Sequence, residues 1–294
     1  MTVYLKAARI RFVSEWGSRS ARRIRDLIYG RLEHAGIHKD CSGKKEKMSE
    51  KKIALITGAN RGIGFETARQ LGQKGVKVLL GARSEKGGKE AADKLKKEGL
   101  DVEFLLLDVS DEKTHAGAKS YIEEKFGRLD ILINNAGVNL EGLPGNLIKP
   151  ASQLPLEVYR KTFEINFFSL VILTQKFLPL LKKSKSGRIV NLSSVLASST
   201  LHATPGSIIY DSKFPAYDIS KTAVNAFTIH LAYELKNTSV KVNAAHPGWV
   251  KTDMGGENAP MEIEDGAKTS VALALLPDDG PTGKYIHLGE ELPW

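Results

Sequence analysis

The sequence contains very little cysteine: Cys41 is the only one among 294 residues. A lone thiol excludes an intrachain disulfide, and 41% of the chain is hydrophobic, so a packed core has to supply the stability. Scarce cysteine is typical of a reducing compartment, and we expect a cytoplasmic protein. The seven histidines show no ligand spacing, and no metal site is expected.

Long apolar runs are also missing. No stretch approaches the roughly 18–20 apolar residues of a membrane-spanning helix, and no apolar core of a secretory signal is present. The net charge of +9 suggests an anionic partner, but residues 1–47 hold 12 Lys and Arg against 5 Asp and Glu. Residues 48–294 keep a net charge of only +2, so we expect neither a nucleic-acid nor a membrane partner for them.

Residues 1–47 differ in composition from the rest of the chain, because arginines interleave with apolar residues there. Three interpretations of this basic extension remain open. It is an organelle-targeting segment, a surface arm for a membrane or nucleic acid, or an inert, disordered extension that reflects a misassigned start. Met48, followed by a short polar stretch and then a strand, resembles a natural beginning. We therefore expect a single folded domain over residues 48–294.

From residue 52 onward, short β-branched apolar runs alternate with longer amphipathic stretches. Runs that are apolar throughout are typical of parallel strands buried on both faces, and the stretches between them are long enough for crossover helices. This alternation predicts a doubly wound, Rossmann-like α/β fold with a mostly parallel seven-stranded sheet and helices on both faces. The expected strands are Ile53–Thr57, Val76–Leu80, Val102–Leu107, Ile131–Asn134, Arg188–Leu192, Val240–Ala244 and Lys284–Leu288.

A glycine-rich turn, residues 57–64, follows the first expected strand and opens a helix, with glycines at 58, 62 and 64. Glycines there let the backbone approach a pyrophosphate, while free N–H groups and the helix dipole favour the anion. The spacing differs from the commonest dinucleotide fingerprint. A tight turn without a ligand is the alternative.

The charge at the end of the second strand bears on which dinucleotide binds. An NAD site uses an acidic residue about 20 positions beyond the glycines, whereas an NADP site uses arginine for the 2′-phosphate. Arg83 stands where the acid would be, and Arg61 lies in the glycine turn. Each alone is compatible with a solvated surface arginine, but together they favour NADP, because arginine binds phosphate in a bidentate manner.

Tyr217 and Lys221 are four residues apart at the start of an expected helix, so they share one face. A nearby ammonium favours the phenolate and lowers the pKa of a tyrosine towards working pH, as an acid/base for hydride transfer to a carbonyl requires. Such a pair alone is common on helix surfaces. However, three further motifs fall at the carboxyl edge of the same sheet, namely Ser193–Ser194, Asn134–Gly137 and Pro247–Asp253.

Taken together, these motifs resemble the short-chain dehydrogenase/reductase family, and within it the carbonyl-reductase-like members. The resemblance covers residues 50–294 and none of residues 1–47. It implies an NADP-dependent oxidoreductase that reduces an aldehyde, ketone or quinone, or oxidises the matching alcohol. It is carried by the glycine turn at 57–64, Asn134–Gly137, Ser194, Tyr217 with Lys221, and Pro247 with Gly248.

The resemblance also implies a role for four catalytic residues. Tyr217 would protonate the substrate oxygen or deprotonate an alcohol, and Lys221 would lower the tyrosine pKa and hold the nicotinamide ribose. Ser194, rather than Ser193, would polarise the carbonyl. Asn166 matches the asparagine that anchors a proton relay from the lysine to solvent.

For the cofactor, the resemblance places Asp108 and Val109 beside the adenine and Thr252 against the nicotinamide amide, while Arg61 and Arg83 match the two basic positions associated with NADP. The expected cofactor-binding residues are Gly58, Asn60, Arg61, Gly62, Ile63, Gly64, Arg83, Asp108, Val109, Asn135, Ala136, Gly137, Tyr217, Lys221, Pro247, Gly248, Val250 and Thr252.

One departure concerns Ser194 and Tyr217, which lie 23 positions apart, farther than in most members of the family. The extra residues, around 198–214, are expected to form a loop over the substrate mouth. They also flank a helix that many relatives use to dimerise, so a monomer and a homo-oligomer both stay open. The polar residues of this loop are interpreted as surface residues without a role: His202, Tyr210, Asp211 and Lys213.

The segments that frame the expected cleft are rich in apolar residues, which favours a mostly apolar small-molecule substrate. The alternative function is a non-catalytic, NADP-binding regulatory protein, although the tyrosine, lysine and serine are all in place. Use of NAD with alcohol oxidation also stays open, because the sequence carries no information on direction. The apolar residues of the segments that frame the expected cleft are Leu140, Leu143, Leu196, Phe214, Trp249 and Met254.

Overall fold

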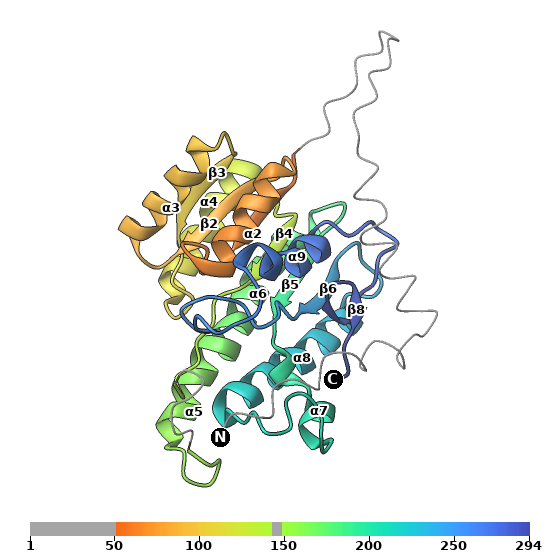
Figure 1. The fold of residues 1–294 in the computed structure, drawn as a ribbon. Coiled ribbons are helices and arrows are strands. Elements are labelled where there is room, and N and C mark those ends of the chain that lie inside the picture. The colour runs from red at the N-terminus through yellow and green to blue at the C-terminus, as the bar shows by residue number, and fades with distance from the viewer. Residues whose placement is uncertain (1–50, 143–148) are drawn as a thin grey trace.

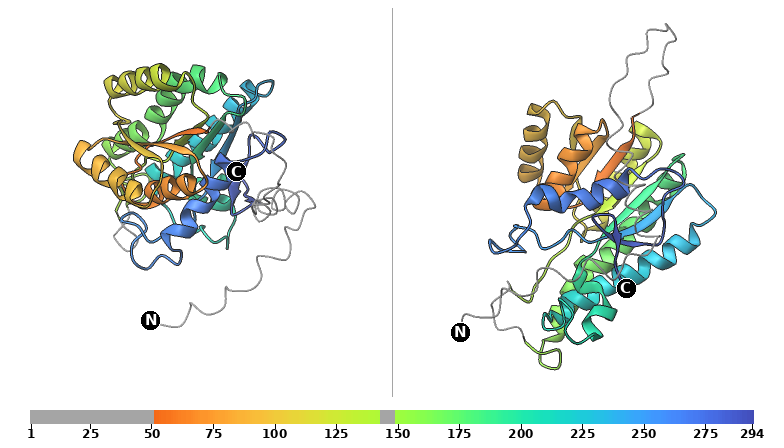
Figure 2. Two further views of the ribbon diagram at one scale, coloured as in Figure 1. Left: turned by 90° about the horizontal axis from the view of Figure 1, so that it is seen from above. Right: turned by 45° about the vertical axis from the view of Figure 1, so that its right-hand side comes forward.

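The computed structural model describes residues 51–142 and 149–294. The three interpretations of residues 1–47 therefore lie outside the described residues, as does the predicted pocket residue Leu143. The described chain forms one sheet covered by helices on both faces (Figures 1 and 2).

The sheet has eight strands in the order β3-β2-β1-β4-β5-β6-β7-β8. The first seven pair in parallel, as their continuous apolar runs predict, and β8 is antiparallel to β7. The strands are β1 (Ile53–Ile56), β2 (Lys77–Ala82), β3 (Val102–Leu106), β4 (Ile131–Asn134), β5 (Arg188–Leu192), β6 (Lys241–Ala245), β7 (Tyr285–His287) and β8 (Glu290–Glu291).

Successive residues of each strand enter two separate cores, because side chains in a strand alternate between the faces. In β1, Ala54 and Ile56 pack with α2, α3 and α9, whereas Ile53 and Leu55 pack with α4, α6 and α8. Figure 1 shows α2 beside α9, far apart in sequence. The helices are α2 (Gly62–Gln73), α3 (Glu85–Lys97), α4 (Glu112–Phe126), α5 (Leu156–Phe163), α6 (Ser169–Lys182), α7 (Ser199–Ala203), α8 (Pro215–Glu234) and α9 (Ile263–Ala274).

The strand order reverses between β1 and β4. From β1 the chain runs outward through β2 to β3, and it then returns to pair β4 with the other side of β1. Ligands of doubly wound sheets bind outside the carboxyl ends of the strands at this switch point. The turn after β1 and the segment after β4 meet there.

The structure differs from the sequence-based expectation in three places. The sheet has eight strands and not seven, because β8 is too short, at two residues, to leave an alternating pattern. The single helix expected over 156–181 is interrupted by a π-helical turn, η1 (Glu164–Phe168). The loop expected over 198–214 contains α7, and a 3-10 turn, η2 (Val195–Ala197), precedes it.

The helical run 156–182 is long and apolar enough to cross a membrane by length and composition alone, contrary to the expectation from the sequence. A core helix meets the same criterion, and 44% of the apolar window is buried inside the protein. Leu173 and Phe177 of α6 are fully buried against the sheet. Core packing therefore accounts for the hydrophobicity of this run.

Phe177→Ala should lower the free energy of unfolding by about 3–5 kcal/mol, because it leaves a cavity under the sheet. Tyr233→Ala on α8 is the matched control, since that ring is 70% exposed, and it should cost less than about 1 kcal/mol. Urea unfolding of both variants measures the difference. Equal losses would contradict the placement of α6.

Candidate active site

The glycine turn adopts the backbone that a close approach to an anion requires. Gly58 and Gly62 have φ angles of +62° and +58°, which favour glycine. Arg61 is the N-cap of α2, yet no side chain caps that helix and no acidic residue occupies its first turn. The first N–H groups and the positive end of the helix dipole are thus left for an anionic ligand.

The end of β4 is bonded directly to this turn. Thr57 Oγ1 accepts hydrogen bonds of 3.0 Å from the backbone N–H groups of Asn135 and Ala136. In return, the Asn135 amide donates to the carbonyl oxygens of Thr57 (2.8 Å) and Gly58 (3.2 Å). The two loops at the switch point therefore hold each other in place.

Two glycines make this contact possible. A Cβ atom on Gly64 would lie 2.5 Å from Asn135 Nδ2 and 2.7 Å from the carbonyl oxygen of Gly58. A Cβ atom on Gly58 would lie 3.1 Å from Ala136 Cα. Any larger residue would separate the turn from β4, so the glycine spacing is explained by packing as well as by ligand approach.

The structure brings Ser194 and Tyr217 together. Ser194 follows β5 and caps η2 by accepting a hydrogen bond from Leu196 N at 3.3 Å. Tyr217 lies in the first turn of α8, and the Ser194 side chain acts on its hydroxyl in the direction of a lower pKa. Two hydroxyl groups from segments 23 residues apart thus converge at the carboxyl edge of the sheet.

Lys221 lies one helical turn beyond Tyr217, with Nζ 5.9 Å from the centre of the tyrosine ring. Its ammonium group donates to the carbonyl oxygen of Leu192 at 2.8 Å. A Cβ atom on Gly137 would lie 3.3 Å from both Lys221 Nζ and Asn166 Oδ1. The lysine, the asparagine and the glycine after β4 are therefore immediate neighbours, as the resemblance implied.

Asn166 lies in the π turn η1, which re-aims its side chain relative to a regular helix. Its amide donates to Val138 O (2.9 Å) and Ser220 Oγ (3.0 Å) and accepts from Val138 N (2.8 Å). Ser220 stands between Tyr217 and Lys221 on α8. Asn166 thus connects the loop after β4 to the helix that carries the tyrosine and the lysine.

The two predicted basic residues lie in different surroundings. Arg61 forms an exposed ion pair with Asp253, in the loop after β6. Arg83, just after β2, is exposed and makes no ion pair within the described parts of the chain. Asn60 and Arg61 line a groove of about 660 Å³ between α2 and α3. Arg83 is free to bind a ligand at once, whereas Arg61 has to leave Asp253.

The loop after β6 returns to the glycine turn. Pro247 is buried, and Gly248 has a φ of +94° where a Cβ atom would lie 2.1 Å from Met261 Sδ. Val250 is buried and pairs with Met261. A Cβ atom on Gly62 would lie 3.7 Å from the Thr252 methyl group, so this loop and the glycine turn border the same space.

The remaining predicted cofactor residues frame the turn. Ile63 packs partly against the core beneath α2. Asp108, after β3, accepts a hydrogen bond at Oδ1 from Ser110 N at 2.9 Å. Val109 lines a small cavity together with Thr57 and Ala136. Val109 therefore lies at the same switch point, as expected.

Burial dominates the electrostatics of the tyrosine and the lysine. It raises the pKa of Tyr217 to about 12, against the opposing contribution of Ser194. It lowers the pKa of Lys221 to about 8. Desolvation of the phenolate outweighs the contribution of Ser194, and the lowering of the tyrosine pKa by Lys221 stays a prediction.

Two carboxyl groups lie at the start of α8. Glu141, from the loop after β4, accepts from Ala216 N at 2.8 and 3.0 Å. Asp218 Oδ2 accepts from Phe214 N at 2.9 Å. Burial raises the pKa of Glu141, and burial together with the nearby Glu141 raises the pKa of Asp218 to about 7. The helix dipole favours both carboxylates, but their desolvation is only partly offset.

Sequence reasoning missed four residues that shape this site. Thr57 and Glu141 act as described above, and the Tyr285 hydroxyl donates to the carbonyl oxygen of Ser194. His246 Nδ1 accepts from Val195 N at 3.0 Å, and the residue is buried at the end of β6. Only Thr57, which begins the glycine turn, left a recognisable signal.

A doubly wound sheet with an open helix N-terminus at its switch point, beside a buried tyrosine, serine and lysine, defines a dinucleotide-binding oxidoreductase. The family model described as short chain dehydrogenase matches residues 52–263. The chain belongs to this family, and it is an oxidoreductase of carbonyl or alcohol substrates. The resemblance drawn from the sequence is thereby confirmed.

Curated relatives match over nearly their whole length. (+)-Neomenthol dehydrogenase of Capsicum annuum is 32% identical, over 83% of this chain and 98% of that protein. Carbonyl reductase (NADPH) 1 of Mus musculus is 32% identical, over 84% of this chain and 99% of that protein.

Solved structures agree. Salutaridine reductase from Papaver somniferum superposes with a TM-score of 0.69 at 31% identity, over 80% of this chain and 99% of that one. NADPH-bound carbonyl reductase from chicken fatty liver has a TM-score of 0.72 at 25% identity, over 83% and 100% of the two chains.

The carboxyl of Asp218 should make the folded protein less stable as pH rises. Its pKa is about 7 in the fold, against roughly 3.9 in an unfolded chain, so the folded state binds the proton more tightly. The resulting stabilisation is complete at acidic pH and is lost between about pH 4 and pH 7. Glu141 contributes in the same direction.

Asp218→Asn removes this titration, so its unfolding free energy should fall less than that of wild type between pH 5 and pH 8. Urea unfolding at the two pH values measures the difference. Identical pH dependence in both proteins would contradict the buried position of Asp218.

Proposed function

We propose that this protein catalyses NADP-dependent hydride transfer between the nicotinamide and a carbonyl or alcohol substrate, with Tyr217 as the acid/base. The observation that carries the proposal is the convergence of Ser194, after β5, and Tyr217, at the start of α8, with Lys221 Nζ 5.9 Å from the tyrosine ring. A carbonyl oxygen within reach of both hydroxyl groups would have one donor that polarises it and one that protonates it.

The residues at the switch point fit a dinucleotide. The glycine turn leaves room for a pyrophosphate, and the uncapped start of α2 offers N–H groups to it. When bound, the cofactor supplies the hydride. Gly58, Gly62 and Gly64 would hold its phosphates, and Gly137 would lie against the ribose and nicotinamide beside Lys221. Asn60, Ile63, Asp108, Val109, Asn135, Ala136, Pro247, Gly248, Val250 and Thr252 would complete the site.

The protonation states favour Tyr217 as a proton donor. With a pKa of about 12 its hydroxyl is protonated at neutral pH, and with a pKa of about 8 Lys221 is mostly an ammonium. Reduction therefore starts from a tyrosine that is ready to protonate the developing alkoxide. In the reverse direction the phenolate has to form, and the ammonium of Lys221 would stabilise it. Asn166 would hold the segment through which the lysine regains its proton.

A preference for NADP rests on Arg83, which is exposed and without an ion pair among the described residues, at the end of β2. Arg61 would add a second guanidinium after leaving Asp253. Two relatives support the same cofactor here. Carbonyl reductase (NADPH) 1 is named for NADPH, and the chicken reductase structure contains bound NADPH.

The substrate is expected to be a mostly apolar ketone, aldehyde or quinone. Leu140, Trp249 and Met254 follow β4 and β6 and are 39–49% exposed, so their apolar surfaces are available to a substrate at this edge of the sheet. Leu196 lies close to Ser194, whereas Phe214 is buried. The similarity to (+)-neomenthol dehydrogenase is consistent with an apolar substrate.

We propose a cytoplasmic enzyme that needs neither nucleic acid nor a membrane for turnover, with organelle targeting by residues 1–47 as the alternative. A protein that lacks residues 1–47 should retain its kcat. Loss of turnover in that variant would show that the extension takes part in the active protein.

Tyr217→Phe should lower kcat for NADPH oxidation with a cyclic ketone by about 100-fold or more, because it removes the proton donor and leaves the fold intact. Absorbance at 340 nm measures turnover, and NADPH fluorescence measures binding, which should change less than about threefold. Near-normal turnover would refute the acid/base assignment. Tight NADPH binding without turnover of any carbonyl by wild type would favour the regulatory alternative.

Arg83→Ala should weaken NADPH binding by about tenfold or more and leave NADH binding nearly unchanged, because only NADPH carries the 2′-phosphate. Lys86→Ala, an exposed cation in the first turn of α3, is the matched control. Fluorescence titration with both cofactors gives the two dissociation constants. Equal losses for NADPH and NADH would remove the basis for the NADP preference.

A further inference from the structure

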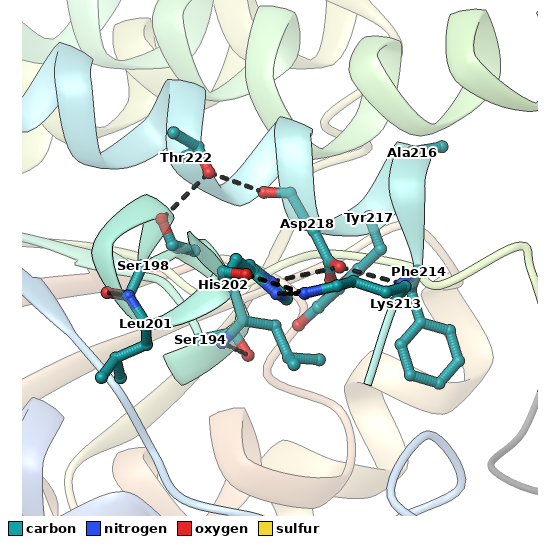
Figure 3. A network of polar contacts seen from close by, with 12 residues as sticks. Ser194, Ser198, Leu201, His202, Lys213, Phe214, Ala216, Tyr217, Asp218 and Thr222 are labelled. Carbon is teal, nitrogen blue, oxygen red and sulfur yellow. Dashed lines mark hydrogen bonds and ion pairs between the residues drawn. The ribbon is translucent and has the colours of Figure 1, made fainter. Parts of the chain in front are cut away.

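The segment 198–214, which separates Ser194 from Tyr217 by 23 positions, is tied to both sides of the active site (Figure 3). Its helix α7 carries His202, which the sequence suggested to be a surface residue. The His202 side chain is only 16% exposed and lies between η2 and the start of α8. The surface interpretation of His202 is therefore wrong.

His202 contacts one segment on each side. Its Nε2 atom lies 2.9 Å from the carbonyl oxygen of Leu196 and 3.3 Å from Asp218 Oδ2. Both partners are acceptors, so Nε2 carries the hydrogen. Leu196 stands two residues after Ser194, and Asp218 directly follows Tyr217. The His202 imidazole thus lies between the Leu196 backbone, two residues after Ser194, and the side chain of Asp218, directly after Tyr217.

The other imidazole nitrogen determines the protonation state. Nδ1 lies 2.9 Å from Lys213 Nζ, which also donates to the carbonyl oxygen of His202 at 3.1 Å. An ammonium donor requires Nδ1 to accept, so the ring is neutral, and its Nε2–H donates to Leu196 O while Asp218 Oδ2 lies 3.3 Å away. Burial and the charge of Lys213 lower the pKa of His202, in agreement with this tautomer.

Asp218 is held in place by the first turn of its own helix, α8, which also carries Tyr217. Its Oδ2 atom accepts from Phe214 N, while its buried Oδ1 atom has no hydrogen-bond partner among the described residues. Thr222 Oγ1 makes a second link between the two segments, donating to Ala197 O (2.9 Å) and Asp218 O (3.0 Å). His202 and Thr222 therefore each link the 3-10 turn that follows Ser194 to α8.

We propose that His202 is a positioning residue: by bonding to Leu196 and lying against Asp218, it keeps Ser194 beside Tyr217. The additional residues of this chain thus supply a clamp for the serine–tyrosine pair in addition to any cover for the substrate. The inference rests on the proposed function, because it is the geometry of that reaction which the clamp maintains.

His202→Ala should lower kcat by about 10- to 100-fold, since a displacement of about 1 Å at reacting groups has such an effect. NADPH binding should stay within about twofold of wild type. His202→Gln keeps an N–H donor towards Leu196 and Asp218, and it should recover most of kcat. Thr204→Ala is the matched control, because its hydroxyl donates to Thr200 O within α7 and touches neither segment.

The split between kcat and KM separates positioning from a general loss of structure. In His202→Ala the loss should fall on kcat, with KM within about twofold of wild type, because the substrate still binds while Ser194 and Tyr217 are displaced from each other. Thr204→Ala and His202→Gln should follow wild type. A kcat of His202→Ala within about twofold of wild type, a KM that rises as much as kcat falls, or failure of Gln to recover kcat would each overturn the clamp.

Amide hydrogen exchange followed by mass spectrometry tests the clamp without relying on turnover. In His202→Ala the peptides that carry residues 195–197 and 215–222 should both exchange faster, and in Thr204→Ala neither should. Unchanged exchange in both peptides overturns the clamp even if the wild type reduces no substrate. Inactivity of wild type alone would overturn the proposed function and leave the exchange result to decide on the clamp.

Discussion

The close contact between the glycine turn and the end of β4 is the constraint on which the active site depends. Gly64 leaves space for the Asn135 amide, which bonds to the carbonyl oxygens of Thr57 and Gly58. A methyl group at position 64 would lie 2.5 Å from that amide. The start of α2, an anion site, and the backbone that leads to Gly137 are thereby placed against one another.

Contacts at the same edge of the sheet also position the reacting groups. Gly137 contacts Lys221 and Asn166, and Asn166 bonds to Val138 on one side and to Ser220 of α8 on the other. On the far side, Tyr285 and His246 hold the backbone at residues 194–195. The Asn166 amide and the contacts at residues 194–195 therefore hold the segments that surround Tyr217. Burial keeps the tyrosine hydroxyl protonated until a substrate oxygen accepts the proton.

Much of the fold could be predicted from the sequence, because buried parallel strands and crossover helices leave strong periodic signals. The seven parallel strands and the neighbours Tyr217, Ser194 and Lys221 are where the motifs indicated. What was missed depends on contacts between distant residues: Glu141 bonds to Ala216, 75 positions away, without any local pattern. Neither the two-residue strand β8 nor the π turn at Asn166 leaves a recognisable pattern in the sequence.

In the proposed reaction, hydride passes from NADPH to a carbonyl carbon while the chain supplies the proton. A direct test incubates the protein with NADPH deuterated at C4 of the nicotinamide and a monocyclic ketone, followed by mass spectrometry of the alcohol. We expect one deuterium on the carbinol carbon with NADPH deuterated on one face of the ring and none with the other. NADPH oxidation that yields no deuterated alcohol from either form would contradict this hydride transfer.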